Sequence, residues 1–278
     1  MDERVAISDV SQRFEFGKNW QRFLVSLDSQ RISRAETSLC SMLGVEDLQH
    51  SSFLDVGCGS GLFSLAAMRK GAERIHSFDY DPDSVACAEE LKRRYFPSAA
   101  DWRIERGDVL DPAYLSSLGQ FDVVYSWGVL HHTGKMWQGL SNVVPLVRPG
   151  GKLFIAIYND QGLRSSLWTR VKILYNYGVV GRLIVIPIFF SCFALRALAK
   201  DLFLHRNSFA RFGKEVKDPR GMAFLTDLLD WLGGYPFEVA RPEQIFDLFR
   251  SKGFELVRLK TAGVNHGNNE FVFVKCAE

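Results

Sequence analysis

The chain has 278 residues, of which 47% are hydrophobic and 13% aromatic, enough for one large domain or a domain with a substantial insertion. Its five cysteines are widely spaced and form no C-x-x-C pair, which argues against a disulfide framework or a structural zinc site and favours a reducing compartment. The net charge of +2 combines +8 over residues 161–220, where eleven Lys/Arg face three acids, with −6 elsewhere, so this basic segment needs its own explanation.

Residues 1–50 read as mostly helical, because apolar residues recur there at steps of three and four. The start is charged and lacks the apolar core of a signal peptide, so we expect a cytoplasmic protein. From residue 52 the pattern alternates between strands and helices. Strands are predicted at FLDVG, RIHSFDYD, WRIERGDVLD, FDVVYSWGVLHH and, after a Pro-Gly-Gly turn, KLFIAIYND. This alternation predicts a parallel sheet covered by helices on both faces.

The alternation stops after Asn159. Residues 161–232 are basic, aromatic and helical in pattern, and a helix and two strands then follow. We therefore predict four parts. They are a helical N-terminal cap (1–50), an α/β core (51–160), a helical insertion (161–232) and a C-terminal segment that completes the core (233–278).

Three glycines, Gly57, Gly59 and Gly61, separate the first strand from its helix. Glycines at this place let the backbone approach a ligand closely, and the helix N-terminus offers unpaired N–H groups. The third glycine comes one residue too early for the dinucleotide fingerprint G-x-G-x-x-G. Asp55 precedes the loop, where a carboxylate would repel a pyrophosphate but accept hydrogen bonds from an ammonium group. The loop therefore predicts a positively charged nucleoside without phosphates.

Further acidic residues stand at the ends of the next two strands. Asp79 follows Gly57 by 22 residues, where a carboxylate can hold both ribose hydroxyls. Tyr80 could lie against a purine, and Asp108 could accept a hydrogen bond from an adenine amino group. Each residue alone could equally be a helix cap, but their order along the chain strengthens the prediction.

The segments LDVGCGSG, FDYDP, GDVLD and VLHHTGKMWQGLSNVVPLVRPGGKLFI resemble the successive motifs of class I S-adenosylmethionine-dependent methyltransferases. The resemblance implies a Rossmann-like, doubly wound α/β fold whose seven-stranded sheet has an antiparallel last strand. It also implies S-adenosylmethionine as cofactor, with the methionine moiety near Asp55 and the glycines, ribose on Asp79 and adenine near Tyr80 and Asp108. The cofactor-binding residues it implies are Asp55, Gly57, Gly59, Gly61, Asp79, Tyr80, Asp108, Val109, Ser126 and Trp127.

Candidate acceptor-side residues follow the fourth and fifth strands. His131 and His132 are candidate general bases, since histidine titrates near neutrality, and His132 is the first choice. The alternative is that one histidine packs or caps the following helix. Tyr158 and Asn159 either face the acceptor or serve as turn residues. Two histidines without nearby acids are too few for a metal, so no metal site is expected.

The insertion contains an apolar run between Arg182 and Arg196. These thirteen uncharged residues are fewer than the ~20 that a membrane span requires. Residues 183–195 could cover the active site, form a homodimer contact, lie at a membrane surface between the flanking cations, or bind a protein partner. The sequence leaves these alternatives open.

The segment GGYPFEVARPEQIFDLFRSKGFELVRLKT resembles the C-terminal part of ubiquinone-pathway O-methyltransferases. The resemblance leads us to expect a methyltransferase for a small-molecule acceptor, through O-methylation of a phenolic or lipid-like compound. One alternative is an RNA (tRNA) methyltransferase whose basic segment grips phosphates. Nucleic acid is not the expected partner, because the insertion is rich in Ile, Leu and Phe. The other alternative is an inactive cofactor-binding partner protein.

Overall fold

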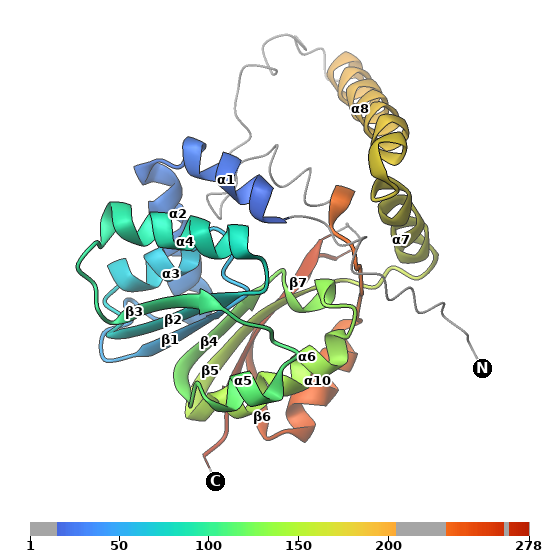
Figure 1. Cartoon of the computed structure of the whole chain (residues 1–278). Coiled ribbons are helices and arrows are strands. Elements are labelled where there is room, and N and C mark those ends of the chain that lie inside the picture. Colours follow the sequence, from blue (N-terminus) through green and yellow to red (C-terminus); the bar gives the residue numbers. More distant parts are fainter. Residues whose placement is uncertain (1–15, 204–231, 264–266, 278) are drawn as a thin grey trace.

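The computed structural model describes residues 16–203, 232–263 and 267–277, and its centre is a seven-stranded sheet (Figure 1). The strand order is β3-β2-β1-β4-β5-β7-β6. β1 to β5 pair in parallel, and β7 runs antiparallel to both β5 and β6. The strands are β1 (Ser52–Val56), β2 (Arg74–Asp79), β3 (Trp102–Arg106), β4 (Phe121–Trp127), β5 (Val147–Tyr158), β6 (Phe254–Lys260) and β7 (Asn268–Lys275). The predicted fold class, including the antiparallel last strand, is confirmed.

Both faces of the central strands are buried. In β1, Phe53 joins the apolar core on one face, while Leu54 and Val56 join the core on the other. This division follows from the period of two in a strand, where successive side chains point to opposite faces. A central strand with two covered faces therefore reads as a nearly continuous apolar run.

Two layers of helices supply these cores (Figure 1). One layer comprises α1 (Phe16–Ser26), α2 (Ser29–Leu43), α3 (Leu62–Arg69) and α4 (Pro82–Tyr95). The other comprises α5 (Pro112–Ser116), α6 (Met136–Asn142) and α10 (Pro242–Ser251), with short 3₁₀ turns at Leu130–His132 and Val144–Leu146. The carboxyl ends of the parallel strands open between these layers, which is where ligands bind in sheets of this kind.

Asp81 fixes the start of α4 and also holds α1. One carboxylate oxygen accepts a hydrogen bond from the Asp83 amide at 2.9 Å, and Pro82 occupies the first turn. Such a cap satisfies a helix N–H that would otherwise lack a partner. The other oxygen accepts from the Gly17 amide at 2.8 Å. α1 is thereby attached to the helix that follows β2.

The Pro-Gly-Gly segment differs from the expected turn, because it lies inside β5. The pairing of β4 with β5 passes from Phe121↔Val147 to Val123↔Lys152, so residues 148–151 bulge out of register. Strand pairing therefore begins before the segment and resumes after it. A bulge of this kind bends a strand without ending it.

The insertion is helical where it is described. α7 (Leu163–Tyr175) and α8 (Gly178–Phe203) follow β5 and stand apart from the helices that cover the sheet (Figure 1). They meet through Tyr175 and Val185, with Leu232, and through the rings of Trp168 and Phe189, whose centroids are 5.0 Å apart. Within the described residues, no helix has both the length and the apolar character needed to cross a membrane. Residues 204–231 lie outside the described part, and the four-part division of the chain stays a prediction.

Candidate active site

The glycine loop folds back over the end of β2. The amides of Gly57 and Cys58 donate to the Phe78 carbonyl at 2.9 and 3.0 Å, and the Gly59 amide donates to Asp79 Oδ2 at 2.9 Å. Gly57, Gly59 and Gly61 all have positive φ, between 53° and 77°. Residues with a Cβ rarely adopt this conformation, so the loop requires glycine at these positions.

The protein's own side chains occupy the space that a Cβ would take in this loop. A Cβ on Gly57 would lie 2.3 Å from Val129 Cγ1, and one on Gly59 would lie 2.9 Å from Nε1 of Trp20. Trp20 belongs to α1, so this helix covers the glycine loop. Trp20 was not predicted as a site residue. It reaches the loop only because Gly17 of the same helix is hydrogen-bonded to Asp81.

Asp55 is a buried carboxylate at the end of β1, with 2% of its surface exposed. Its Oδ2 accepts a hydrogen bond from Ser64 Oγ at 2.5 Å, and Ser64 is in turn 2.7 Å from the Ser77 hydroxyl. Burial raises the pKa of Asp55 to about 7, and the nearby Asp79 adds to this rise while the Ser64 hydroxyl opposes it. The site therefore disfavours the ionised form in the absence of a cation.

Asp79 stands beside it at the end of β2. Its two oxygens accept backbone hydrogen bonds, one from Gly59 and one from Asp81, each at 2.9 Å. Burial raises the pKa of Asp79 to about 6, against these donors. Each carboxylate oxygen can accept more than one hydrogen bond, so Asp79 retains capacity for ribose hydroxyls.

Tyr80 is exposed beyond the end of β2, with the Arg106 guanidinium 5.4 Å from its ring centroid. Asp108 lies in the loop after β3, where its Oδ1 accepts from the Leu110 amide at 2.8 Å. Val109 is buried in the apolar core. Each of these three places is compatible with the cofactor role that the resemblance implies, and the role stays a prediction.

Ser126 and Trp127 close β4, as the sequence predicts. Ser126 is fully buried, and its hydroxyl donates to the Val56 carbonyl at 3.1 Å, which ties the ends of β4 and β1 together. Trp127 is half-buried and packs against the core on the α3 side. Ser126 therefore supports the site from within the sheet.

His132 is held in one tautomer. Its Nδ1 lies 2.6 Å from the Pro236 carbonyl, which can only accept, so Nδ1 carries the proton and Nε2 keeps the lone pair. Burial, together with the charge of Lys172, lowers the pKa of His132 to about 3. The hydrogen bond to Pro236 opposes this shift. The ring is therefore neutral throughout the physiological pH range.

His131 is a fully buried neighbour of His132. Its Nδ1 accepts from the Tyr158 amide at 3.3 Å, and its ring centroid lies 4.1 Å from that of Tyr158. Burial lowers its pKa well below the ordinary value, with the His132 and Lys172 charges adding to the effect. These contacts pack the 3₁₀ turn that contains His131 against the end of β5, and its role as a base stays a prediction.

Lys172 of α7 joins this group and was not predicted from the sequence. Its side chain is only 1% exposed, and its Nζ lies 4.8 Å from the ring centroid of Phe237 and 5.7 Å from that of Tyr158. Stacked over two aromatic rings, the ammonium group gains cation–π stabilisation. No motif marks Lys172 in the sequence, where it is one of eleven basic residues between positions 161 and 220.

Asn159, directly after β5, is hydrogen-bonded to the Asn269 side chain and to the Gly263 backbone. Its Oδ1 accepts from Asn269 Nδ2 at 3.0 Å, and its own Nδ2 donates to the Gly263 carbonyl at 3.2 Å. Both ends of the amide are thus used within the fold. Tyr158, by contrast, packs against His131, His132, Lys172 and Phe237.

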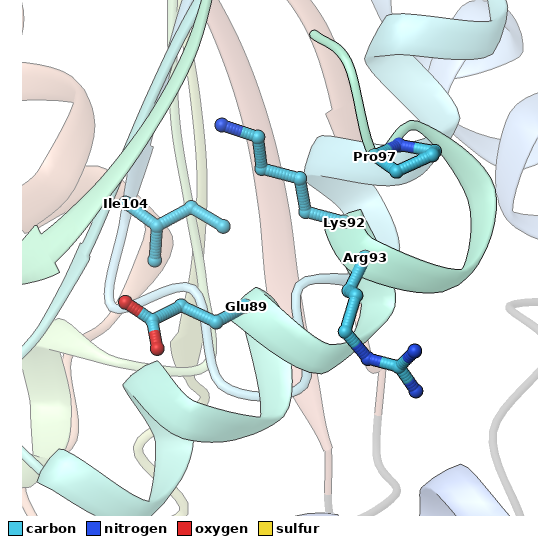
Figure 2. A pocket seen from close by; sticks show the side chains of 5 residues that line it. All are labelled: Glu89, Lys92, Arg93, Pro97 and Ile104. Atoms are coloured by element: carbon cyan, nitrogen blue, oxygen red, sulfur yellow. The ribbon is translucent and has the colours of Figure 1, made fainter. Parts of the chain in front are cut away.

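Other candidate sites lie away from this edge or lack ligands. Among the described residues no group of three His, Cys, Asp or Glu side chains is placed to hold a metal ion. A surface pocket between α4 and β3 is lined by Glu89, Lys92, Arg93, Pro97 and Ile104 (Figure 2). None of these residues belongs to the predicted site.

Residues 54–153 match the family described as "Methyltransferase domain". They contain the glycine loop, the buried Asp55, the half-buried Asp79 and both histidines. Over this stretch the chain is similar to methyltransferase domains.

Curated relatives match less than half of this chain. Ribosomal protein L11 methyltransferase of Methylococcus capsulatus is 31% identical over 121 residues, which cover 43% of this chain and 38% of that protein. The tRNA U34 carboxymethyltransferase of Idiomarina loihiensis is 27% identical over 135 residues, covering 44% and 38%. The match thus spans about two fifths of the length of these relatives.

Solved structures extend the similarity to nearly the whole fold. Magnesium protoporphyrin IX methyltransferase from Synechocystis PCC 6803, determined with bound S-adenosylhomocysteine, superposes with a TM-score of 0.53 at 15% identity. The superposition covers 93% of each chain. At this identity the likeness establishes the fold that surrounds the methyltransferase domain.

Proposed function

We propose that this protein transfers a methyl group from S-adenosylmethionine to a small-molecule acceptor. The observation that carries the proposal is the pair of carboxylates beside the glycine loop, the buried Asp55 and the half-buried Asp79. Burial raises the pKa of both, so ionising them in the apo protein is unfavourable. A cationic ligand offsets that cost, which an anionic dinucleotide cannot do.

The residues present fit this cofactor by the chemistry of their polar groups. Asp55 would face the charged methionine part, and Asp79 would accept hydrogen bonds from the ribose hydroxyls. Trp20 provides aromatic surface against Gly59, and Tyr80 an exposed ring after Asp79. When bound, the cofactor supplies an activated methyl group on a sulfonium centre.

The acceptor is proposed to bind against His132, Tyr158, Lys172 and Phe237. The rings of His132, Tyr158 and Phe237, with Lys172 behind them, form an aromatic wall near the carboxyl ends of β4 and β5. An aromatic wall stacks well on a planar ring. This favours a phenolic or similarly apolar acceptor over a strongly hydrated one.

The work of the chain is to align the acceptor. Alignment converts a bimolecular step into an effectively unimolecular one. His132 presents Nε2 as a lone-pair acceptor because the Pro236 carbonyl holds the proton on Nδ1. With a pKa of about 3 it is a weak base, so we assign it to orienting the acceptor hydroxyl through a hydrogen bond, while the proton released on methyl transfer passes to water.

A second candidate function is methylation of RNA. The similarity to a tRNA U34 carboxymethyltransferase and the +8 charge of residues 161–220 support it. Phosphate contacts would make activity on RNA fall steeply with salt. Activity on an apolar phenol would depend only weakly on salt, and this difference separates the two functions.

Calorimetric titration tests the cofactor assignment first. S-adenosylmethionine and S-adenosylhomocysteine should bind, NAD should not, and Asp79→Ala should abolish binding. Binding of NAD, or of none of the three, would overturn the proposal. Once binding is shown, His132→Ala tests the acceptor side. Methyl transfer to phenols should fall by about 10²-fold with cofactor affinity unchanged, and unaltered transfer would remove His132 from the reaction.

A further inference from the structure

The hairpin of α7 and α8 carries large apolar side chains that are exposed in the described part of the chain. On α7 they are Leu163, Leu167 and Leu174, with Leu163 90% exposed, and Tyr177 follows in the turn before α8. On α8 the exposed large apolar residues are Val179, Val180, Leu183, Ile184, Ile186, Ile188 and Leu195. Contiguous exposed apolar surface on this scale marks an interaction site.

The inner side of the same helices is accounted for by packing. Gly181 and Val185 of α8 are buried, and Phe189 contacts Trp168 of α7. These three positions follow one another at four-residue steps, so one face of α8 seals against α7. The exposed residues occupy the remaining faces, which α7 cannot reach.

The charge of these two helices is predominantly positive. Residues 161–203 contain one acid, Asp201, and six basic residues, Arg164, Arg170, Lys172, Arg182, Arg196 and Lys200. Arg164, Arg170 and Arg182 are exposed beside the apolar residues. An apolar helix face bordered by cations is the arrangement that enters the boundary between lipid headgroups and acyl chains, and cations near it are attracted to anionic lipids.

We propose that the α7–α8 hairpin docks onto an anionic lipid surface, with the apolar side chains entering the interface and the arginines contacting headgroups. A symmetric second copy fits less well, because a two-fold contact would place two copies of the same positively charged surface against each other. An RNA backbone would satisfy the arginines but leave the leucines and valines in water. The proposal is independent of methyl transfer and of the cofactor.

Vesicle co-sedimentation of the full chain tests this proposal. Vesicles of phosphatidylcholine with phosphatidylglycerol should bind the protein, and vesicles of phosphatidylcholine alone should bind at least tenfold more weakly. The double variant Val180→Glu/Leu183→Glu should lower binding to the anionic vesicles by at least tenfold. Its matched control is Val257→Glu/Leu259→Glu, at exposed positions of β6, and should bind like the parent.

Three outcomes would overturn the proposal: no binding to anionic vesicles, equal loss in both double variants, or equal binding to the two kinds of vesicle. Sedimentation velocity gives an independent arm. A dimer that Val180→Glu/Leu183→Glu dissociates would assign the surface to a second copy instead. Calorimetry with S-adenosylhomocysteine on the same variants reports whether the core is intact and separates failure of this proposal from failure of the proposed function.

Discussion

Asp55 makes the stability of the apo protein depend on pH in a direction opposite to that of most carboxylates. Its pKa rises from an ordinary 3.8 to about 7 in the folded state, because burial penalises the charge. The folded protein therefore holds this proton more tightly than the unfolded chain does. The stability that this proton contributes is complete below about pH 4, falls steadily as the pH rises, and is gone above about pH 7.

The magnitude follows from the distance between the working pH and the folded pKa. At pH 5 the folded pKa lies about two units above the pH, and each unit corresponds to about 1.4 kcal/mol. Between pH 5 and pH 8 the apo protein should therefore lose about 2.7 kcal/mol of unfolding free energy through Asp55. Asp55→Asn removes this titration and keeps an oxygen that can accept from Ser64.

Urea unfolding of the apo protein at pH 5 and pH 8 measures the effect. The drop between the two pH values should be smaller in Asp55→Asn than in the parent by about 2.7 kcal/mol. Asp247→Asn, at an exposed position on α10, should show the parental drop. Equal drops in the parent and in Asp55→Asn would refute the assignment of an uncompensated buried carboxyl at this position.

Further predictions concern His132 and Lys172 on the acceptor side and Trp20 of α1. Methyl transfer should show no inflection near pH 6.5, because burial keeps His132 neutral there; an inflection that His132→Gln abolishes would contradict this. Lys172→Met should raise the pKa of His132 by removing a nearby charge, and an unchanged NMR titration of that ring would count against the contact. Trp20→Ala should weaken S-adenosylhomocysteine binding about tenfold by calorimetry, since the indole covers Gly59; unaltered affinity would place Trp20 outside the site.

The sheet was largely predictable because its signals are local. The strands that end at Asp79 and at the glycine loop are short apolar runs, which by themselves indicate buried strands. Asp81 followed by Pro82 indicates the start of a helix without reference to the rest of the fold. The antiparallel β7 could not be read from periodicity, since alternation reports burial and not direction. It came from the resemblance to a known family.

The candidate site was predictable where one motif contains all its parts, as for Asp55 and Gly57. Lys172 and Trp20 could not be found, because each reaches the site from a separate helix whose position depends on tertiary packing. The state of His132 was also beyond the sequence. A histidine titrates near neutrality until burial and a neighbouring ammonium group are known, and both come from the assembled fold.

α7 presents two different surfaces to two different surroundings. Lys172 points inward onto Phe237 and Tyr158, while Leu167 and Leu174, within a turn and a half of it, point outward. A rigid helix cannot shift one of these surfaces without shifting the other. Any free energy by which an event on the outer surface changes acceptor affinity must therefore reappear, with equal size, as an effect of the acceptor on the outer surface. Through α7, acceptor binding near Lys172 and attachment of the outer surface are therefore linked by the same coupling free energy.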